Sequence, residues 1–195
     1  MAFLLGLPAR LQAAGLSVSV IDSAGKPVAD AVVYAIPEAG GATPARGATA
    51  VLDQIDKEFV PFVLPVQVGA AVSFPNRDKY RHHVYSFSPP KVFDLKLYSG
   101  VPEKPIVFDK PGMVVLGCNI HDDMVGFVYV VETPWFAKTS SKGGATLELP
   151  PGEYEVRVWH PWQRGDIARE RVKVDAGDTR ASVRVDLAPP ASARR

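Results

Sequence analysis

Residues 116–128 read L-G-C-N-I-H-D-D-M-V-G-F-V, and three different kinds of potential metal ligand fall within them. Cys118 is the only cysteine of the 195-residue chain, His121 follows it after two intervening residues, and Met124 follows after two more. A thiol, an imidazole and a thioether at the spacing C-x2-H-x2-M lie within reach of one soft or borderline ion. Taken singly, Cys118 would be interpreted as a small buried residue and Met124 as core filling. Their occurrence together predicts a shared metal ion.

The composition is that of an ordinary globular protein, with 47% hydrophobic and 22% charged residues. A formal net charge of +1 gives no reason to expect nucleic acid as a partner. No apolar run is long enough to span a bilayer, so stable membrane insertion is not expected. Eighteen prolines and 16 glycines between valine-rich segments predict short strands joined by turns, and therefore an all-β protein.

The amino-terminal segment 1–14, MAFLLGLPARLQAA, is apolar and ends in small residues, which is typical of an export signal with its cleavage site. It departs from such a signal because no positive charge precedes the apolar part and Arg10 interrupts it. We expect export to the periplasm. A single cysteine excludes an internal disulfide, so in an oxidising compartment the thiol of Cys118 is expected to be buried or occupied by a metal.

Two segments, residues 16–37 and 137–187, carry alternating strands around the turns D-S-A-G-K-P and P-P-G. Their sequences V-I-D-S-A-G-K-P-V-A-D-A-V-V and T-S-S-K-G-G-A-T-L-E-L-P-P-G-E-Y-E-V resemble the two halves of a transthyretin-like or carboxypeptidase regulatory-like β-sandwich, in which the second motif forms a hairpin. The long separation of the halves implies that a second domain is inserted into a loop of the first. The tail 188–195 is expected to be disordered.

The intervening residues 48–132 resemble a cupredoxin of the plastocyanin and amicyanin type. The resemblance is carried by V-x-x-G-A-A-V-S-F-P-N-R-D, by H-H-V, and by P-G-x5-C-N-I-H-D-D-M-V-G-F-V-Y-V. It implies a cupredoxin Greek-key sandwich nested within the second small β-sandwich. It also implies one copper ion, cycling between Cu(I) and Cu(II), held by His82, Cys118 and His121 with an axial Met124.

One departure from the family pattern concerns the first imidazole, because the family writes H-N-V where this chain has H-H-V. We assign the ligand place to His82, which shares a strand face with the apolar Val84. Strand alternation leaves His83 as an alternative, since it shares a face with Tyr85 and Phe87, which look core-like. His83 otherwise replaces an asparagine that ties the ligand strand to the cysteine loop. His83 and Asn119 are therefore expected to support the ligands by hydrogen bonds.

Three further residues have two interpretations each. Asp122 and Asp123 follow His121 and either steer a basic redox partner or are solvated loop charges. His160, in the sequence V-W-H-P-W, is interpreted as a structural member of an aromatic cluster rather than as a metal ligand.

The predicted function is that of an exported type 1 (blue) copper protein, not an enzyme, carrying single electrons between a redox donor and acceptor. Composites of this kind resemble methylamine utilisation proteins, which implies partners such as a cytochrome or a periplasmic dehydrogenase. A copper carrier without an electron-transfer role and a single-copper enzyme stay open as alternatives. Multicopper enzymes need more histidines, commonly as H-x-H pairs, whereas this chain has four histidines and no such pair. Zinc is disfavoured because its structural sites prefer more thiolates.

Overall fold

The computed structural model of the chain describes residues 14–41 and 47–188. The predicted export segment and the predicted tail lie, apart from Ala14 and Ala188, outside the described residues. Over these residues every regular element is a β-strand and none is a helix, which confirms the all-β class. It follows that no apolar helix of membrane-spanning length occurs in this part of the chain.

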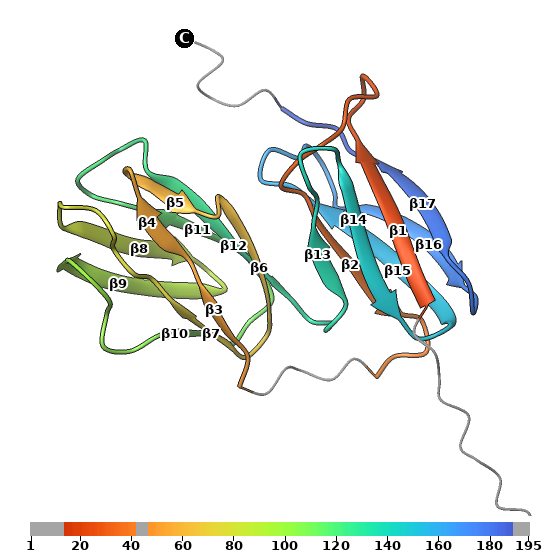
Figure 1. Ribbon diagram of the computed structural model, residues 1–195, viewed down its shortest axis with the longest axis horizontal. Helices are drawn as coiled ribbons and strands as arrows, with labels where there is room; N and C mark the ends of the chain where they lie inside the picture. Colours follow the sequence, from red (N-terminus) through yellow and green to blue (C-terminus); the bar gives the residue numbers. More distant parts are fainter. Residues whose placement is uncertain (1–13, 42–46, 189–195) are drawn as a thin grey trace, which may run out of the picture.

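The chain ends build one sandwich, called the flanking sandwich, from two facing sheets with strand orders β14-β1-β17 and β13-β2-β15-β16 (Figure 1). Alternate residues along its strands, such as Leu16, Val18 and Val20, are buried between the two sheets. The strands are β1 (Ala14–Ile21), β2 (Val32–Pro37), β13 (Phe136–Lys138), β14 (Gly144–Leu149), β15 (Gly152–Trp159), β16 (Ala168–Val174) and β17 (Thr179–Arg184).

The two predicted turns of this sandwich are corners between sheets. Strands β1 and β2, which flank D-S-A-G-K-P, lie in different sheets, and so do β14 and β15, which flank P-P-G. The expected hairpin at P-P-G is therefore wrong. Pro150 and Pro151 lack the N–H groups that a continuing ladder needs, so the chain crosses from one sheet to the other at this point.

The middle of the chain builds the central sandwich, in which the sheet β6-β12-β11-β8-β9 faces the sheet β10-β7-β3, and the hairpin β4-β5 lies beside them. Most pairs are antiparallel, but β6 with β12 and β3 with β7 run parallel. The strands are β3 (Thr49–Val51), β4 (Asp53–Ile55), β5 (Glu58–Val60), β6 (Val63–Gln67), β7 (Ala70–Ser73), β8 (His82–Ser88), β9 (Lys91–Tyr98), β10 (Ile106–Phe108), β11 (Gly112–Gly117) and β12 (Val125–Val131).

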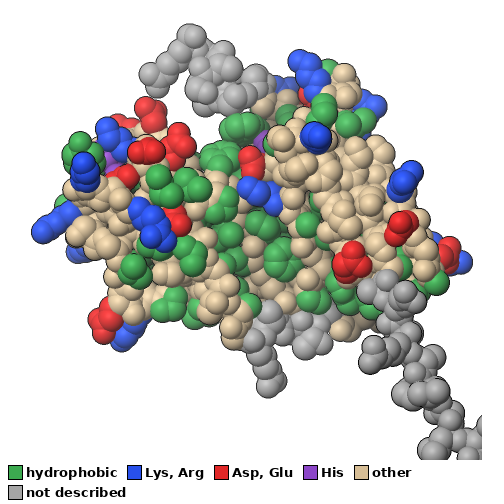
Figure 2. Space-filling model, in the orientation of Figure 1, with side chains coloured by type: hydrophobic (Ala, Val, Ile, Leu, Met, Phe, Trp, Pro, Cys, Tyr) green, Lys and Arg blue, Asp and Glu red, His purple; other side chains and the backbone are tan. Residues whose placement is uncertain are grey.

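An aromatic seam joins the two sandwiches. The outer face of β2 and β15 packs on the outer face of β6 and β12, and hydrophobic side chains gather over this junction (Figure 2). Trp159 of β15 stacks on Tyr129 of β12 with ring centroids 4.2 Å apart and planes 15° apart. The hydroxyls of Tyr34 and Tyr129 lie 3.3 Å apart. The two sandwiches therefore share buried apolar surface and are packed as one body.

Replacing Trp159 by alanine should lower the free energy of unfolding by about 3–5 kcal/mol, because the side chain is buried in the seam and its removal leaves a cavity. Urea unfolding monitored by circular dichroism measures the change. Trp162, which is 37% exposed, is the matched control, and its alanine variant should lose much less. Equal losses of unfolding free energy in the two variants would show that burial of Trp159 in the seam adds nothing to stability.

His160 lies in this region as expected, within an aromatic cluster and away from the metal-ligand candidates. Its ring lies 5.2 Å from that of Trp162, and its Nδ1 accepts a hydrogen bond from the backbone N–H of Trp162 at 3.2 Å. Burial lowers the pKa of His160 below its ordinary value of 6.5, while the charge of Asp30 and a backbone hydrogen bond at Ala29 oppose this shift. The folded protein therefore favours neutral His160.

The free energy of unfolding should fall as the pH drops below about 6.5, because the unfolded chain then binds a proton at His160 more readily than the folded chain. His160→Gln should lack this part of the pH dependence. The measurement is urea unfolding of both proteins at a series of pH values from about 7.5 to about 5. Parallel curves for the variant and the wild type would contradict the shifted pKa.

Candidate metal centre

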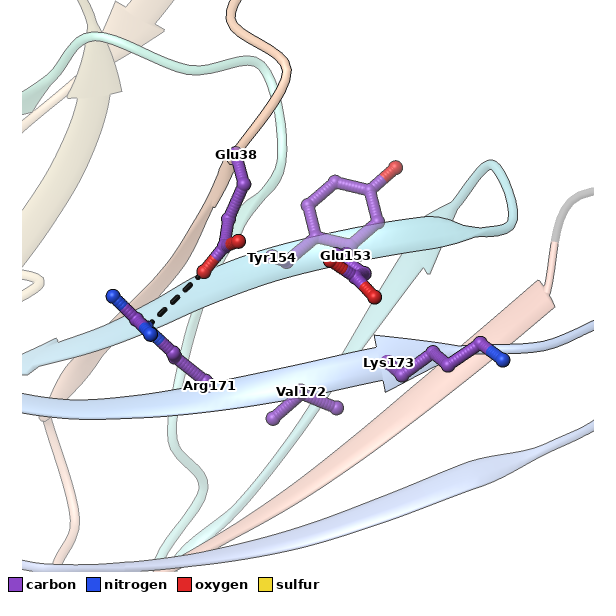
Figure 3. Close-up of a pocket in the computed structure, with 6 residues that line it drawn as sticks. All are labelled: Glu38, Glu153, Tyr154, Arg171, Val172 and Lys173. Carbon is purple, nitrogen blue, oxygen red and sulfur yellow. Dashed lines mark ion pairs between the residues drawn. The ribbon is translucent and has the colours of Figure 1, made fainter.

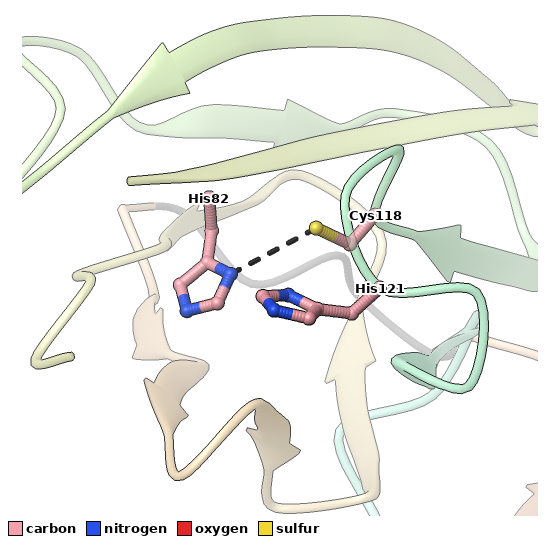
Figure 4. A group of neighbouring side chains, drawn as sticks. All are labelled: His82, Cys118 and His121. Atoms are coloured by element: carbon pink, nitrogen blue, oxygen red, sulfur yellow. Dashed lines mark hydrogen bonds between the residues drawn. The ribbon is translucent and has the colours of Figure 1, made fainter. Parts of the chain in front are cut away.

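Three of the four predicted ligands meet at one end of the central sandwich (Figure 4). His82 is the first residue of β8, Cys118 directly follows β11, and His121 lies on the loop before β12. The two strands are neighbours in the sheet, and Gly117 pairs with Tyr85. One potential ligand atom from each of the three residues lies within 4.8 Å of the others. The fold thus brings together residues separated by 36 positions in the chain.

The distance between two of these atoms fits a shared ion. Nδ1 of His82 lies 3.8 Å from Sγ of Cys118. Metal–nitrogen and metal–sulfur bonds of about 2.0 and 2.3 Å, as in zinc sites, would place two such atoms about 3.7 Å apart at a trigonal angle. His82 is 0% and Cys118 4% exposed, so water has little access to either.

The strongest sign that this group binds a metal is at His121. Its Nδ1 is buried and has no hydrogen-bond partner among the described residues. Buried polar atoms are almost always satisfied, so an unpaired nitrogen on an imidazole ring that lies beside a thiol and a second imidazole has the surroundings of a metal ligand. The ring of His121 lies 5.1 Å from that of His82. The residues present therefore fit a copper ion with one thiolate and two imidazoles.

Met124, the predicted axial ligand, is 2% exposed and belongs to the same core cluster as Cys118. Its backbone N–H donates to the carbonyl of His121 at 3.0 Å, which closes the loop into a tight turn. This turn brings the chain of Met124 back toward the loop residues that precede it. Met124 is thus buried in the core next to the end of the loop that carries His121.

Sequence reasoning missed Asp78, which contacts the predicted ligand His82 through the ring nitrogen that is not directed to Cys118. Oδ2 of Asp78 lies 2.8 Å from Nε2 of His82. Burial raises the pKa of Asp78, but hydrogen bonds from the N–H of Lys57, from His82 and from the N–H of Asp56 outweigh it and hold the pKa below its ordinary value of 3.8. The ionised carboxylate accepts a hydrogen bond from Nε2–H of His82, which leaves Nδ1 of the same ring free to bind a metal.

His83 lies on the other face of β8 from His82. Its Nε2 pairs with the carboxylate of Asp94 on β9, so it ties β8 to β9 instead of to the cysteine loop. The expectation that Phe87 looks core-like was wrong, because it is 79% exposed on the outer face of the sheet, and Tyr85 on the same face is only half-buried. The flanking sandwich covers β6 and β12 on this outer face. The core face of β8 is the one that holds His82.

The remaining predicted site residues, Asn119, Asp122 and Asp123, are all exposed on the loop that carries His121. Their supporting and docking roles stay predictions.

A hollow on the flanking sandwich offers different chemistry (Figure 3). An ion pair of 3.2 Å between Arg171 and Glu38 crosses it. Its walls carry carboxylates and cations but no sulfur or imidazole, so they lack the soft donors that copper prefers. The lining residues are Glu38, Glu153, Tyr154, Arg171, Val172 and Lys173.

No protein-family model matches the sequence, and no curated protein sequence does either. Among solved structures, the chain is similar to a Cu-containing nitrite reductase from Thermus scotoductus SA-01, with 29% identity and a TM-score of 0.41 over 49% of this chain. The present chain spans only 25% of the length of that enzyme. A purple cupredoxin from Nitrosopumilus maritimus (23% identity, TM-score 0.37) matches 43% of this chain over 99% of its own. A reduced Cu(I) form of a mutant amicyanin (22% identity, TM-score 0.39) matches 50% of this chain over 99% of its own.

Replacing Asp78 by asparagine should weaken copper binding about 10–100-fold, because His82 loses the ionised acceptor that fixes its ring and proton. Competition against a chelator of known affinity measures the change. Asp109→Asn is the matched control, since Asp109 is an exposed carboxylate paired with Lys91 away from the ligands, and it should bind copper as the wild type does. Equal affinities for both variants would contradict the role of Asp78.

Proposed function

We propose that this chain is an exported type 1 copper protein that carries single electrons between redox partners and is not itself an enzyme. The observation that carries the proposal is the group of His82, Cys118 and His121, in which Nδ1 of His121 is buried without a hydrogen-bond partner among the described residues. The sequence resemblance of residues 48–132 to cupredoxins supports the same metal and the same function.

The ligand set suits one-electron chemistry. Copper bound here supplies a redox couple in which thiolate and thioether favour Cu(I) and imidazoles favour Cu(II). The residues of this chain exclude water and hold the ligands in place: Cys118 and Met124 are packed in the core, and Asp78 orients the ring of His82. A site held in this way changes little between the two oxidation states, which suits fast electron transfer.

The proposed contact with redox partners lies around His121, the only one of the three clustered residues that is not fully buried. The neighbouring Ile120 is 48% exposed and supplies an apolar contact, while Asp122 and Asp123 are exposed beside it. In this proposal the two carboxylates steer a basic donor or acceptor, such as a cytochrome or a periplasmic dehydrogenase, toward the imidazole edge. The location that follows is the periplasm.

A hollow of about 250 Å³ beside Met124 favours a single-copper enzyme as the second candidate function. Its walls come from β5 and the residues that follow it, and from the loop before β12 with the start of that strand, and it offers a small molecule room near the predicted axial ligand. Copper carriage finds no comparable support, because His82 and Cys118 are buried and transfer of the metal would require the site to open. The hollow is lined by Glu58, Phe59, Phe62, Asp123, Met124 and Val125.

The purified protein should develop an intense visible thiolate-to-copper band when one equivalent of Cu(II) is added, and coulometric titration should then consume one electron per chain. Cys118→Ser should abolish the band because it removes the thiolate. His160→Gln, which changes a histidine outside the group, should keep it. A colourless protein, or a band that survives in Cys118→Ser, would sink the proposed copper site. A band without reversible reduction would leave a copper protein that transfers no electrons.

A further inference from the structure

The turn of the hairpin β4-β5 has an unusual backbone. Asp56 and Lys57 adopt φ values of 54° and 66°, in the left-handed region that glycine and asparagine usually occupy. Two-residue hairpins of this geometry normally carry Asn-Gly or Asp-Gly. Residues forced into such a conformation persist where surrounding contacts over-determine them, and these positions cluster at functional sites. The contacts that hold this turn therefore indicate what its unusual backbone serves.

Both N–H groups of the turn point at one carboxylate. The N–H of Asp56 donates to Oδ1 of Asp78 at 2.7 Å, and that of Lys57 donates to Oδ2 at 2.9 Å. Successive backbone N–H groups in a turn can form a concave anion site of this kind. The same Oδ2 binds Nε2 of His82. The conformation of the turn is thus coupled through one side chain to a predicted ligand.

The first strand of the hairpin also runs along the segment that leads into His82. The N–H of Gln54 donates to the carbonyl of Pro75 at 2.9 Å, and the carbonyl of Gln54 accepts from the N–H of Arg77 at 3.0 Å. Nε of Arg77 in turn pairs with Oδ1 of Asp53 at 2.8 Å. Strand β4 therefore binds residues 75–77, which precede His82, and the turn after β4 binds Asp78.

The second strand of the hairpin reaches the other ligand segment. Phe59 of β5 is 2% exposed and lies in the core cluster that contains Cys118 and Met124. It sits directly on Gly126, where a Cβ atom would lie 2.7 Å from the Cβ of Phe59. Gly126 follows Met124 by two residues, so β5 packs on the chain immediately beyond the predicted axial ligand.

We propose that the hairpin β4-β5 is the positioning element of the metal centre. It holds His82 through Asp78 and holds the segment of Met124 through Phe59, and so it fixes two ligands that lie far apart in the sequence. This inference rests on the proposed function only in that the centre binds copper. Loosening either contact should let the bound metal leave faster and should alter the thiolate-to-copper band.

The test compares pairs of variants of the full copper-loaded chain. Lys57→Pro removes one N–H donor and cannot adopt a positive φ, whereas Lys57→Gly keeps the N–H and suits the turn. Phe59→Ala removes the contact with Gly126, whereas Phe59→Leu keeps an apolar side chain there. We expect copper loss to a chelator about tenfold faster, with a shifted band, in Lys57→Pro and Phe59→Ala. The matched glycine and leucine variants should stay within about twofold of the wild type.

The inference is overturned if both disruptive variants lower only the midpoint of urea unfolding and keep the wild-type rate of copper loss and the wild-type spectrum. If Lys57→Pro does not fold, Phe59→Ala decides alone. Neither readout uses electron transfer. A wild-type protein that binds copper but passes no electrons would therefore end the proposed function and leave this inference standing.

Discussion

Three potential ligand atoms crowded within 4.8 Å of one another, at the buried end of a sheet, are the constraint on which the rest of the structure depends. A buried imidazole nitrogen without a partner, such as Nδ1 of His121, costs about 1–3 kcal/mol relative to a satisfied one. No hydrogen-bond partner for this nitrogen lies among the described residues. The arrangement is thus unfavourable for the metal-free chain and becomes favourable when an ion binds all three atoms.

The surrounding fold maintains this arrangement from two sides. Neighbouring strands β8 and β11 bring His82 and Cys118 to the same sheet end, while Asp78 fixes the ring of His82 from behind. On the opposite face of the same sheet, the aromatic seam attaches the flanking sandwich to β6 and β12. Because β12 starts directly after Met124, the seam also anchors the strand that follows the ligand loop. The flanking sandwich therefore supports the sheet that carries the site without contributing a ligand candidate.

Local patterns predicted what depends on local sequence. Alternation gave the buried face of β1 and placed His82 with Val84 on the core face of β8, and the C-x2-H-x2-M spacing anticipated the meeting of Cys118 and His121. Tertiary contacts governed the rest. Asp78 becomes important only because a distant hairpin folds against it. Phe87 is apolar yet exposed, because the flanking sandwich covers other strands of its sheet. The chain turns from one sheet to the other at P-P-G because β14 and β15 join different sheets, and the alternation of residues along a strand does not indicate which sheet the strand joins.

X-ray absorption at the copper edge, on protein loaded with one equivalent of metal, tests the central claim most directly. The account predicts a short copper–sulfur bond and two imidazole nitrogens in the wild type, and the loss of that sulfur bond in Cys118→Ser. Nitrogen and oxygen scatterers alone in the wild type, or a spectrum unchanged by Cys118→Ser, would show that the metal binds elsewhere and that the buried group is not its site.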